Sequence, residues 1–374
     1  MTIRRMSRKL MGQLMGQLMG RTLSVHARCV ARRAFSLRHH GGRVARLVLW
    51  LTVAAVAAEI PEAPAQAPQY APLISPLKVE QVPGRPIYYS VGNPGVPGQA
   101  NQGNTSNAGF VVTSGGVVVF DALGTPSLGW ALLQDIRKTA AAPIRYNVVS
   151  HYHADHIYGL QAFKDHTDTV VIAQDRAREY RENEETADER ADQRLDQRRE
   201  ALAPWVNADT RVVPPDITFN DRLTLTLGGK RFELIYAGPA HSASDMMMMV
   251  EPDGVLFAGD IVQNGRIPFM NSDDVDTRQW LAALEEVERL DPKFIIPGHG
   301  RPSTAAKEAI AFTRDYIQFV RAAMAAAVDS WTDFDDAYRQ TDWSKYADMP
   351  AFGANNRGNA YRIFLELEKS QFKR

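Results

Sequence analysis

The sequence predicts a mixed α/β fold in which sheets are covered by helices. Short apolar runs with strand-like composition alternate with stretches of helical spacing from about residue 77 onward. Several of these runs end in histidine or aspartate, and the largest such group is His151 to His156. Sheets covered by helices place their functional sites at the carboxyl ends of strands. We therefore expect one site, assembled from the ends of several strands.

The charge of the chain is unevenly distributed. The formal net charge is zero, but residues 1–58 hold 11 Lys and Arg and no Asp or Glu, so the rest carries 43 acidic residues against 32 basic ones. So acidic a body is poorly suited to nucleic acid or an anionic membrane, and we expect neither as a partner. The expected partner is a small-molecule substrate. The sequence does not indicate an oligomeric state. The single cysteine, Cys29, leaves the body without a disulfide or a thiolate ligand.

Residues 1–58 have the composition of an export signal. The apolar run Leu47 to Ala58 follows a basic stretch and is shorter than the roughly 20 residues that span a bilayer. Small-residue cleavage sites follow at Ala55-Val56-Ala57 and Ala63-Pro64-Ala65. We expect a periplasmic or secreted protein, with no membrane attachment after cleavage.

Arg32 and Arg33 in this leader resemble a twin-arginine export signal, which suits a protein that folds around its metal before export. Two arginines in a basic leader are the alternative interpretation. Residues 59–76 are rich in Pro and Ala and predict a flexible linker.

The first half of the body predicts strands, a helix and the histidine cluster in that order. A loop rich in Gly, Pro and Asn over 92–103 either borders the site as a flap or is a simple connection. The predicted elements are a hairpin over Leu77 to Val91, two strands over Phe110 to Asp121 that turn at Gly115-Gly116, a helix over Pro126 to Thr139, and a strand over Tyr146 to Ser150.

A helical insertion is expected over 175–204. Residues 175–200 hold 10 acidic and 7 basic residues, and opposite charges recur four positions apart. This pattern predicts a solvated helix, and a lid that recognises substrate is the alternative.

The second half repeats the pattern of strands that end in polar residues, and residues 303–374 predict a helical extension. Met246 to Val250 lies between two site loops, which favours core filling over a Met-rich binding surface. The predicted elements are a hairpin of Leu223–Leu227 and Phe232–Tyr236, strands over Met246–Val250, Leu256–Asp260 and Phe294–Gly300, and helices over 277–290, 304–328 and 357–370.

Six histidines follow the leader, and five of them lie at strand ends. Those five are His151, His153, His156, His241 and His299, and the carboxylates Asp155 and Asp260 accompany them. The sixth, His166, is interpreted as structural or solvent-exposed. Four ligand side chains between His151 and His156 cannot all reach one ion, but they can divide between two neighbouring ions. We therefore expect a dinuclear site for zinc, with iron or a mixed pair as alternatives.

These motifs resemble the metallo-β-lactamase superfamily. The matching sequence is His-x-His-x-Asp-His, then Gly-Pro-Ala-His-Ser, Ala-Gly-Asp and Pro-Gly-His-Gly, and it covers about residues 77–302. The resemblance implies an αββα four-layer sandwich. It also implies that two zinc ions share a hydroxide that attacks the substrate.

The resemblance assigns the ligands. One ion is held by His151, His153 and His241, and the other by Asp155, His156 and His299, with Asp260 bridging the two. Asp155 would also orient the hydroxide and transfer its proton, which makes it the expected catalytic residue. Asp121 matches a position that orients the ligand loop.

Asp260 indicates the branch of the superfamily, because the metallo-β-lactamases proper have cysteine or serine there and glyoxalase II-like hydrolases have aspartate. The expected function is hydrolysis of a small ester, thioester, lactone or amide. The alternatives are a persulfide dioxygenase with one iron, a β-lactamase, and a non-catalytic accessory protein of a periplasmic redox system.

Two weaker expectations concern the substrate and the tail. Asn264 and Arg266 follow Asp260 on a loop that should face the metals, and Arg266 could hold a substrate carboxylate or be exposed to solvent. Residues 356–368 resemble periplasmic family members that accompany quinoprotein and sulfur-oxidation systems; an amphipathic terminal helix is the alternative.

Overall fold

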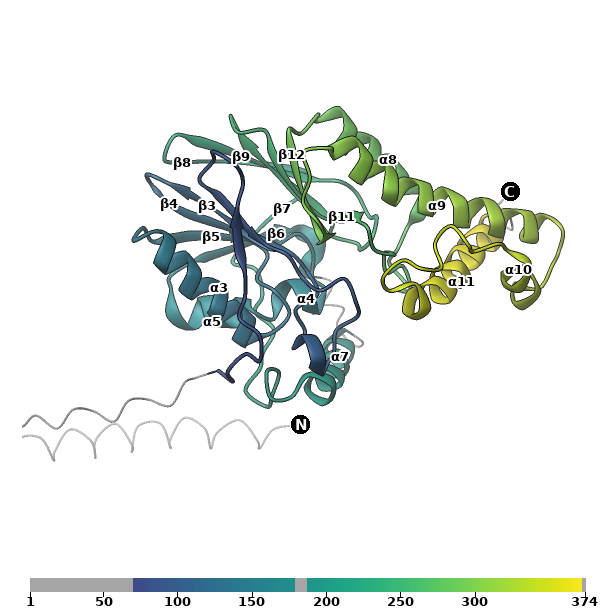
Figure 1. The fold of residues 1–374 in the computed structure, drawn as a ribbon, viewed down its shortest axis with the longest axis horizontal. Coiled ribbons are helices and arrows are strands. Elements are labelled where there is room, and N and C mark those ends of the chain that lie inside the picture. Colours follow the sequence, from purple (N-terminus) through teal and green to yellow (C-terminus); the bar gives the residue numbers. More distant parts are fainter. Residues whose placement is uncertain (1–69, 179–186, 372–374) are drawn as a thin grey trace, which may run out of the picture. The chain divides into compact units, whose positions relative to one another are not determined.

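The computed structural model describes residues 70–178 and 187–371 (Figure 1). The predicted export signal and residues 59–69 of the predicted linker lie outside the described residues, as does the part of the charged insertion over 179–186. Within the described residues, no helix combines the length and apolar character needed to cross a membrane.

Two sheets form the centre of the fold. The first has seven strands in chain order, antiparallel from β1 to β4 and parallel from β4 to β7. Its strands are β1 (Val79–Gln81), β2 (Ile87–Ser90), β3 (Ala108–Thr113), β4 (Gly116–Phe120), β5 (Ile144–Val148), β6 (Val170–Gln174) and β7 (Ile217–Phe219).

The second sheet has five strands in the order β12-β11-β10-β9-β8. All neighbours are antiparallel except β11 and β12, whose parallel pairing brings their carboxyl ends together. The strands are β8 (Arg222–Leu227), β9 (Lys230–Tyr236), β10 (Met246–Glu251), β11 (Val255–Asn264) and β12 (Phe294–Gly300).

Helices cover the outer face of each sheet (Figure 1). The first sheet carries α3 (Pro126–Thr139) and α5 (Leu160–His166), with α4 (Ala154–Ile157) at the histidine cluster. The second carries α8 (Thr277–Arg289) and α9 (Ala306–Asp329), onto which α10 (Phe334–Gln340) and α11 (Phe352–Gln371) pack. The remaining helical elements are η1 (Gln99–Asn101), η2 (Asp175–Arg178) and α7 (Ala187–Leu202).

Alternation along the strands divides the apolar side chains into three cores. Val118 of β4 and Met248 of β10 face the space between the two sheets. Val119, next along β4, packs on the side of α3, whereas Met249, next along β10, packs on the side of α8 and α9. This period of two produces helix, sheet, sheet and helix layers. The predicted αββα sandwich is thus confirmed, and the methionine run fills the core on both faces of its strand.

Some elements differ from the prediction. The helix over Pro126–Thr139 has the predicted bounds, and Thr125 caps it by accepting the Leu128 amide at 3.1 Å. The strand predicted over 146–150 lies at 144–148, and the helix predicted from 357 begins at Phe352. The elements α5, β6, β7 and α10 were not predicted. Three of these are too short to show a period, and β6 is covered on both faces, so its apolar residues do not alternate with polar ones.

Gly159 provides a test of how tightly the histidine loop is packed. A Cβ at this position would lie 1.8 Å from the carbonyl oxygen of Ala122 and 2.9 Å from the Cα of Gly129 on α3. We expect Gly159→Ala to lower the free energy of unfolding by about 1–3 kcal/mol, because backbone must move to admit the methyl group. Urea denaturation would measure the loss. Gly353→Ala is the matched control, since a Cβ added there would meet nothing within 4 Å; equal effects of both substitutions would contradict the packing argument.

Candidate metal centre

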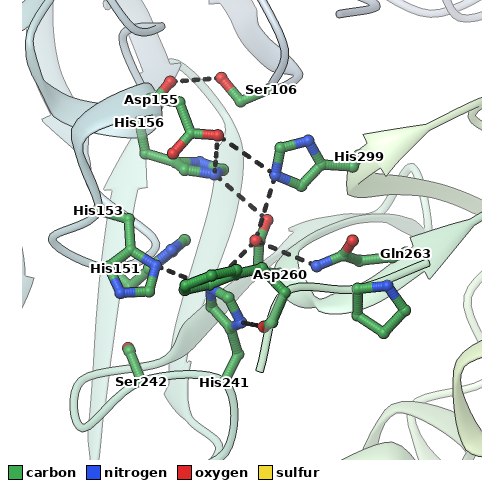
Figure 2. A network of polar contacts seen from close by, with 12 residues as sticks. Ser106, His151, His153, Asp155, His156, His241, Ser242, Asp260, Gln263 and His299 are labelled. Atoms are coloured by element: carbon green, nitrogen blue, oxygen red, sulfur yellow. Dashed lines mark hydrogen bonds and ion pairs between the residues drawn. The ribbon is translucent and has the colours of Figure 1, made fainter. Parts of the chain in front are cut away.

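The seven side chains predicted as metal ligands lie together where the two sheets meet (Figure 2). The first sheet contributes the loop after β5 and helix α4, which carry His151 to His156. The second sheet contributes the loop after β9, with His241, and the strands β11 and β12, with Asp260 and His299. His166 lies outside this cluster, at the end of α5, where its ring centroid is 4.4 Å from that of Trp130.

One group of potential donors consists of His151, His153 and His241, whose ligand atoms all lie within 4.8 Å of one another. Nδ1 of His153 and Nε2 of His241 are only 2.8 Å apart. Nε2 of His151 is buried and has no hydrogen-bond partner among the described residues. Three imidazole nitrogens directed at one point match the ligand set of a borderline-soft divalent cation such as zinc.

A second group consists of Asp155, His156 and His299, again within 4.8 Å of one another. Oδ2 of Asp155 is 3.4 Å from Nε2 of His299 and 3.9 Å from Nε2 of His156. The Nε2 atom of His156 likewise lacks a hydrogen-bond partner among the described residues. This set mixes imidazole and carboxylate donors.

Asp260 lies between the two groups. One of its oxygens is 3.2 Å from Nε2 of His156, and the other is 3.2 Å from Nε2 of both His241 and His299. Each group therefore has access to an oxygen of the same carboxylate. The bridging role that the family resemblance implies for Asp260 stays a prediction.

Four of the five imidazoles are fixed through the nitrogen that faces away from the cluster. An oxygen that accepts from Nδ1 selects the tautomer whose Nε2 lone pair faces inward. The Ser150 hydroxyl can accept from His151 because it donates its own hydrogen to Asp121. The Nδ1 contacts are His151 to Ser150 Oγ at 2.9 Å, His156 to Asp121 Oδ2 at 2.8 Å, His241 to the Phe269 carbonyl at 2.9 Å, and His299 to the Thr105 carbonyl at 2.6 Å.

Asp121 connects two of these contacts. Its carboxylate accepts the backbone N–H of Ser150 and the Ser150 hydroxyl, both at 2.8 Å, in addition to its contact with His156. Asp121 is buried and has a φ of 59°, in the left-handed region that few residues other than glycine adopt. The structure thus places Asp121 behind the ligand loop, where it can orient His156 directly and His151 through Ser150.

Burial and neighbouring charges set the protonation of the cluster. Burial lowers the pKa of His151 and His241, and lowers the pKa of His153 to about 3, so these rings are neutral and can act as donors. Burial also acts to lower the pKa of His156, but the charges of Asp260, Asp121 and Asp155 outweigh it and raise that pKa well above the usual value. The three carboxylates thus attract positive charge to this point.

These observations fit bound cations. The donor set combines imidazole with carboxylate, and Oδ1 of Asp260 joins the Nε2 atoms of His151 and His156 as buried atoms without a hydrogen-bond partner in the described part of the chain. Buried polar atoms are normally paired, so their number at one point indicates that a ligand completes the arrangement.

The structure adds residues that the sequence analysis did not identify. Gln263 donates to Oδ2 of Asp260 at 3.2 Å, and its own backbone is held by the Thr313 hydroxyl of α9 at 2.9 and 2.8 Å. Ser150 could have been suspected from its place directly before His151. Thr105 and Phe269 contribute backbone carbonyls, which carry no signal in the residue type.

A cavity of about 860 Å³ opens over the cluster. Val96 and Pro97 of the predicted flap line it, so this loop borders the site. Arg198 and other residues of α7 line it too, although the side chains that the structure describes in this helix, over 193–202, are mostly exposed, as the charge pattern predicts. The alternative interpretation, a lid that recognises substrate, stays a prediction. The loop 269–274 and the first turn of α11 complete the wall.

Of the two residues predicted to contact substrate, only one lies in the cavity wall. Asn264 is not part of the cavity wall; its side-chain amide donates to the Arg301 carbonyl at 2.8 Å, because β11 continues to Asn264 and pairs it with Gly300. Arg266 does line the cavity and is only 4% exposed, which excludes the alternative of a solvent-facing arginine.

Comparisons with known proteins give one family match and several distant likenesses. A family model described as the metallo-beta-lactamase superfamily matches residues 102–299, which is more than half of the chain. Among solved structures, a metallo-beta-lactamase from Pontibacter korlensis is 19% identical with a TM-score of 0.49, over 65% of this chain and 99% of that chain.

Curated relatives are distant in sequence. The linear primary-alkylsulfatase of Pseudomonas sp. (strain ATCC 19151) is 22% identical over 55% of this chain and 44% of that protein. The metallo-beta-lactamase type 2 of Bacteroides fragilis is 27% identical over 23% of this chain and 36% of its own length. The type 2 enzyme of Elizabethkingia meningoseptica is 22% identical over 57% and 77%. The chain thus spans less than half the length of the first two relatives.

Replacing Asp121 tests the role of the residues behind the ligands. Asn is the most suitable substitute because it tolerates a positive φ while removing the charge that faces His156. We expect Asp121→Asn to weaken zinc binding by about 10- to 100-fold, as losses of such outer contacts do. Competition with a chelating dye would measure the affinity. Asp168→Asn, on an exposed residue, is the control, and unchanged affinity in Asp121→Asn would show that Asp121 does not orient the donors.

Proposed function

Because this chain belongs to the metallo-β-lactamase superfamily, we propose that it is an exported hydrolase that binds two zinc ions and cleaves a small ester, thioester, lactone or amide. The sulfatase and β-lactamases to which it is similar are hydrolases. The observation that carries the proposal is the arrangement of two buried donor groups around the single carboxylate of Asp260.

The proposed ligands follow the two groups. His151, His153 and His241 would hold one ion. Asp155, His156 and His299 would hold the other, and Asp260 would serve both. Two zinc ions bound there would supply an activated water and Lewis acidity for the departing group. The chain supplies no cysteine in its body, so no thiolate nucleophile is available to replace this chemistry.

Asp155 is the residue best placed to handle a proton. It lines the cavity, and its side chain is 17% exposed, compared with 4% or less for His156, His241, Asp260 and His299. Burial alone would raise its pKa, but the adjacent His156 and His299 lower it, so the carboxylate stays ionised. An ionised carboxylate at the cavity surface can accept a hydrogen bond from water and orient it toward a bound substrate. The Thr105 hydroxyl, 3.3 Å from Oδ2 of Asp155, helps to hold the carboxylate in place.

The cavity favours a small substrate. Its volume of about 860 Å³ lies in the range of pockets for small molecules, and its walls combine apolar side chains with charged ones. Phe269 and Val96 supply apolar surface at 39% and 45% exposure. A hydrolysis panel should therefore include aryl esters, thioesters, lactones, sulfate esters and β-lactams, the last two because of the relatives named above.

Metal content and a single substitution test the proposal together. We expect the purified protein to contain close to two zinc ions per chain and to hydrolyse at least one member of the panel. His153→Ala should reduce that turnover by at least about 100-fold, since a ligand is lost from one ion. His166→Gln is the control, because it changes the one histidine of the described body that lies outside the cluster.

Two other outcomes would contradict the hydrolase proposal. One iron per chain with oxygen uptake on a persulfide would establish the dioxygenase alternative instead. Full metal loading without turnover of any panel member would favour an accessory role.

Export is a separate part of the proposal, supported by the basic and apolar leader. We expect protein recovered from a bacterial periplasmic fraction to begin after Ala57 or Ala65, since small-residue cleavage sites end there. Amino-terminal sequencing would identify the first residue. Changing both Arg32 and Arg33 to Lys should block export if the twin-arginine route is used. A full-length chain confined to the cytoplasm would contradict this part of the proposal.

A further inference from the structure

Residues 267–271 follow β11 and form neither helix nor strand. Phe269 and Asn271 in this segment line the cavity, and the Phe269 carbonyl accepts from Nδ1 of His241 at 2.9 Å. Buried backbone N–H and C=O groups that have no partner in a helix or sheet must find one elsewhere. Here the side chains of α11, in the C-terminal extension, supply several of these partners.

Two asparagines one turn apart on α11 hold the segment. Asn355 donates to the carbonyls of Ile267 and Pro268 at 3.2 and 3.3 Å. Asn359 donates to the Pro268 carbonyl at 2.7 Å and accepts the Met270 amide at 2.8 Å. Residues four positions apart lie on the same face of a helix, so both side chains reach the same stretch of backbone.

Asn359 binds the same peptide group as His241. The peptide between Phe269 and Met270 carries the C=O that accepts from His241 and the N–H that donates to Asn359. These groups form one hydrogen-bonded chain, in which each bond polarises the next, so the bond to Asn359 strengthens the carbonyl as an acceptor. A carbonyl held in this way keeps the proton of His241 on Nδ1 and leaves the Nε2 lone pair for a cation.

The polar atoms of Asn359 are all paired, although its side chain is fully buried. Besides its two contacts with the segment, its amide donates to the Tyr316 hydroxyl at 3.0 Å, and that hydroxyl donates to Asn356 at 2.9 Å. This network fixes the direction of the Asn359 amide, with the oxygen toward Met270 and the nitrogen toward Pro268. An apolar side chain of similar size would fill the space, so packing alone does not require asparagine here.

We propose that Asn359 is a positioning residue for His241, which it orients through the peptide between Phe269 and Met270. The C-terminal extension would thereby set the zinc affinity of the donor group to which His241 belongs. This inference rests on the proposed binding of zinc and adds to it a residue that touches neither metal nor substrate.

Zinc affinity of the full chain tests the proposal. Asn359→Leu keeps a similar volume but removes all three hydrogen bonds. We expect it to weaken zinc binding by about 3- to 10-fold, less than the 10- to 100-fold typical of a residue that contacts a ligand directly. Competition with a chelating dye would measure the affinity. Asn359→Asp keeps an oxygen that can accept the Met270 amide, so it should recover part of the loss.

Asn356→Leu is the matched control. Asn356 is an equally buried asparagine on the same helix, but it pairs with the hydroxyls of Tyr316 and Tyr338 instead of with residues 267–271. We expect this variant to leave zinc affinity nearly unchanged. Equal losses in Asn356→Leu and Asn359→Leu would overturn the proposal, because they would indicate that α11 acts only through general stability.

The protonation of His241 gives a second measurement that needs neither zinc nor turnover. NMR of the metal-free protein with nitrogen-labelled histidines should show the His241 proton on Nδ1, in slow exchange with water. Asn359→Leu should speed up that exchange, whereas Asn356→Leu should not. A wild-type His241 that carries its proton on Nε2 would overturn the proposal even if Asn359→Leu fails to fold.

These measurements separate failure of this inference from failure of the proposed function. A chain that binds no zinc but shows exchange at His241 that depends on Asn359 would contradict the proposed function and still support the positioning of His241. Zinc binding with turnover, combined with unchanged exchange and affinity in Asn359→Leu, would overturn the inference and leave the proposed function standing.

Discussion

The burial of Asp260 among imidazoles is the constraint on which the rest of the structure depends. Its two oxygens lie 3.2 Å from nitrogens of His156, His241 and His299, which come from both sheets. This geometry requires the two sheets to keep a fixed position relative to each other across the core that they share. Gly298 shows how little freedom is left, because a Cβ there would lie 2.0 Å from Oδ1 of Asp260. Glycine in the Pro-Gly-His motif is therefore required by the close approach of β12 to this carboxylate.

The C-terminal helices stabilise the site from behind. Thr313 of α9 holds the backbone of Gln263, and the Gln263 amide donates to Asp260. On α11, Asn355 donates to the carbonyls of Ile267 and Pro268, and Asn359 accepts the amide of Met270 at 2.8 Å. These contacts fix the segment that begins at Arg266 and includes Phe269, whose carbonyl accepts from His241. The extension thus connects the metal centre to the cavity wall, a role that neither its amphipathic pattern nor its resemblance to periplasmic relatives predicts.

The sequence predicts the parts of the site that depend on side-chain chemistry. Histidine and aspartate at strand ends identify the residues that the structure brings together at the cluster. It does not predict parts that depend on backbone geometry. The carbonyls of Thr105 and Phe269 orient His299 and His241 whatever their side chains are. The absence of Asn264 from the cavity wall also follows from backbone geometry. The strand predicted to end at Asp260 continues to Asn264, which keeps that residue in the sheet and leaves Arg266 as the first of the pair to reach the cavity.

Charge and burial act together at the donor groups. Against the effect of burial, the carboxylates of Asp260, Asp121 and Asp155 raise the pKa of His156 well above its usual value, so this point strongly favours positive charge. Burial lowers the pKa of the three histidines of the other group, so their rings stay neutral and keep a lone pair for a cation. Under the proposed function, cations held by the two groups would supply the positive charge that the carboxylates favour, and would pair the buried oxygen of Asp260 that has no hydrogen-bond partner among the described residues.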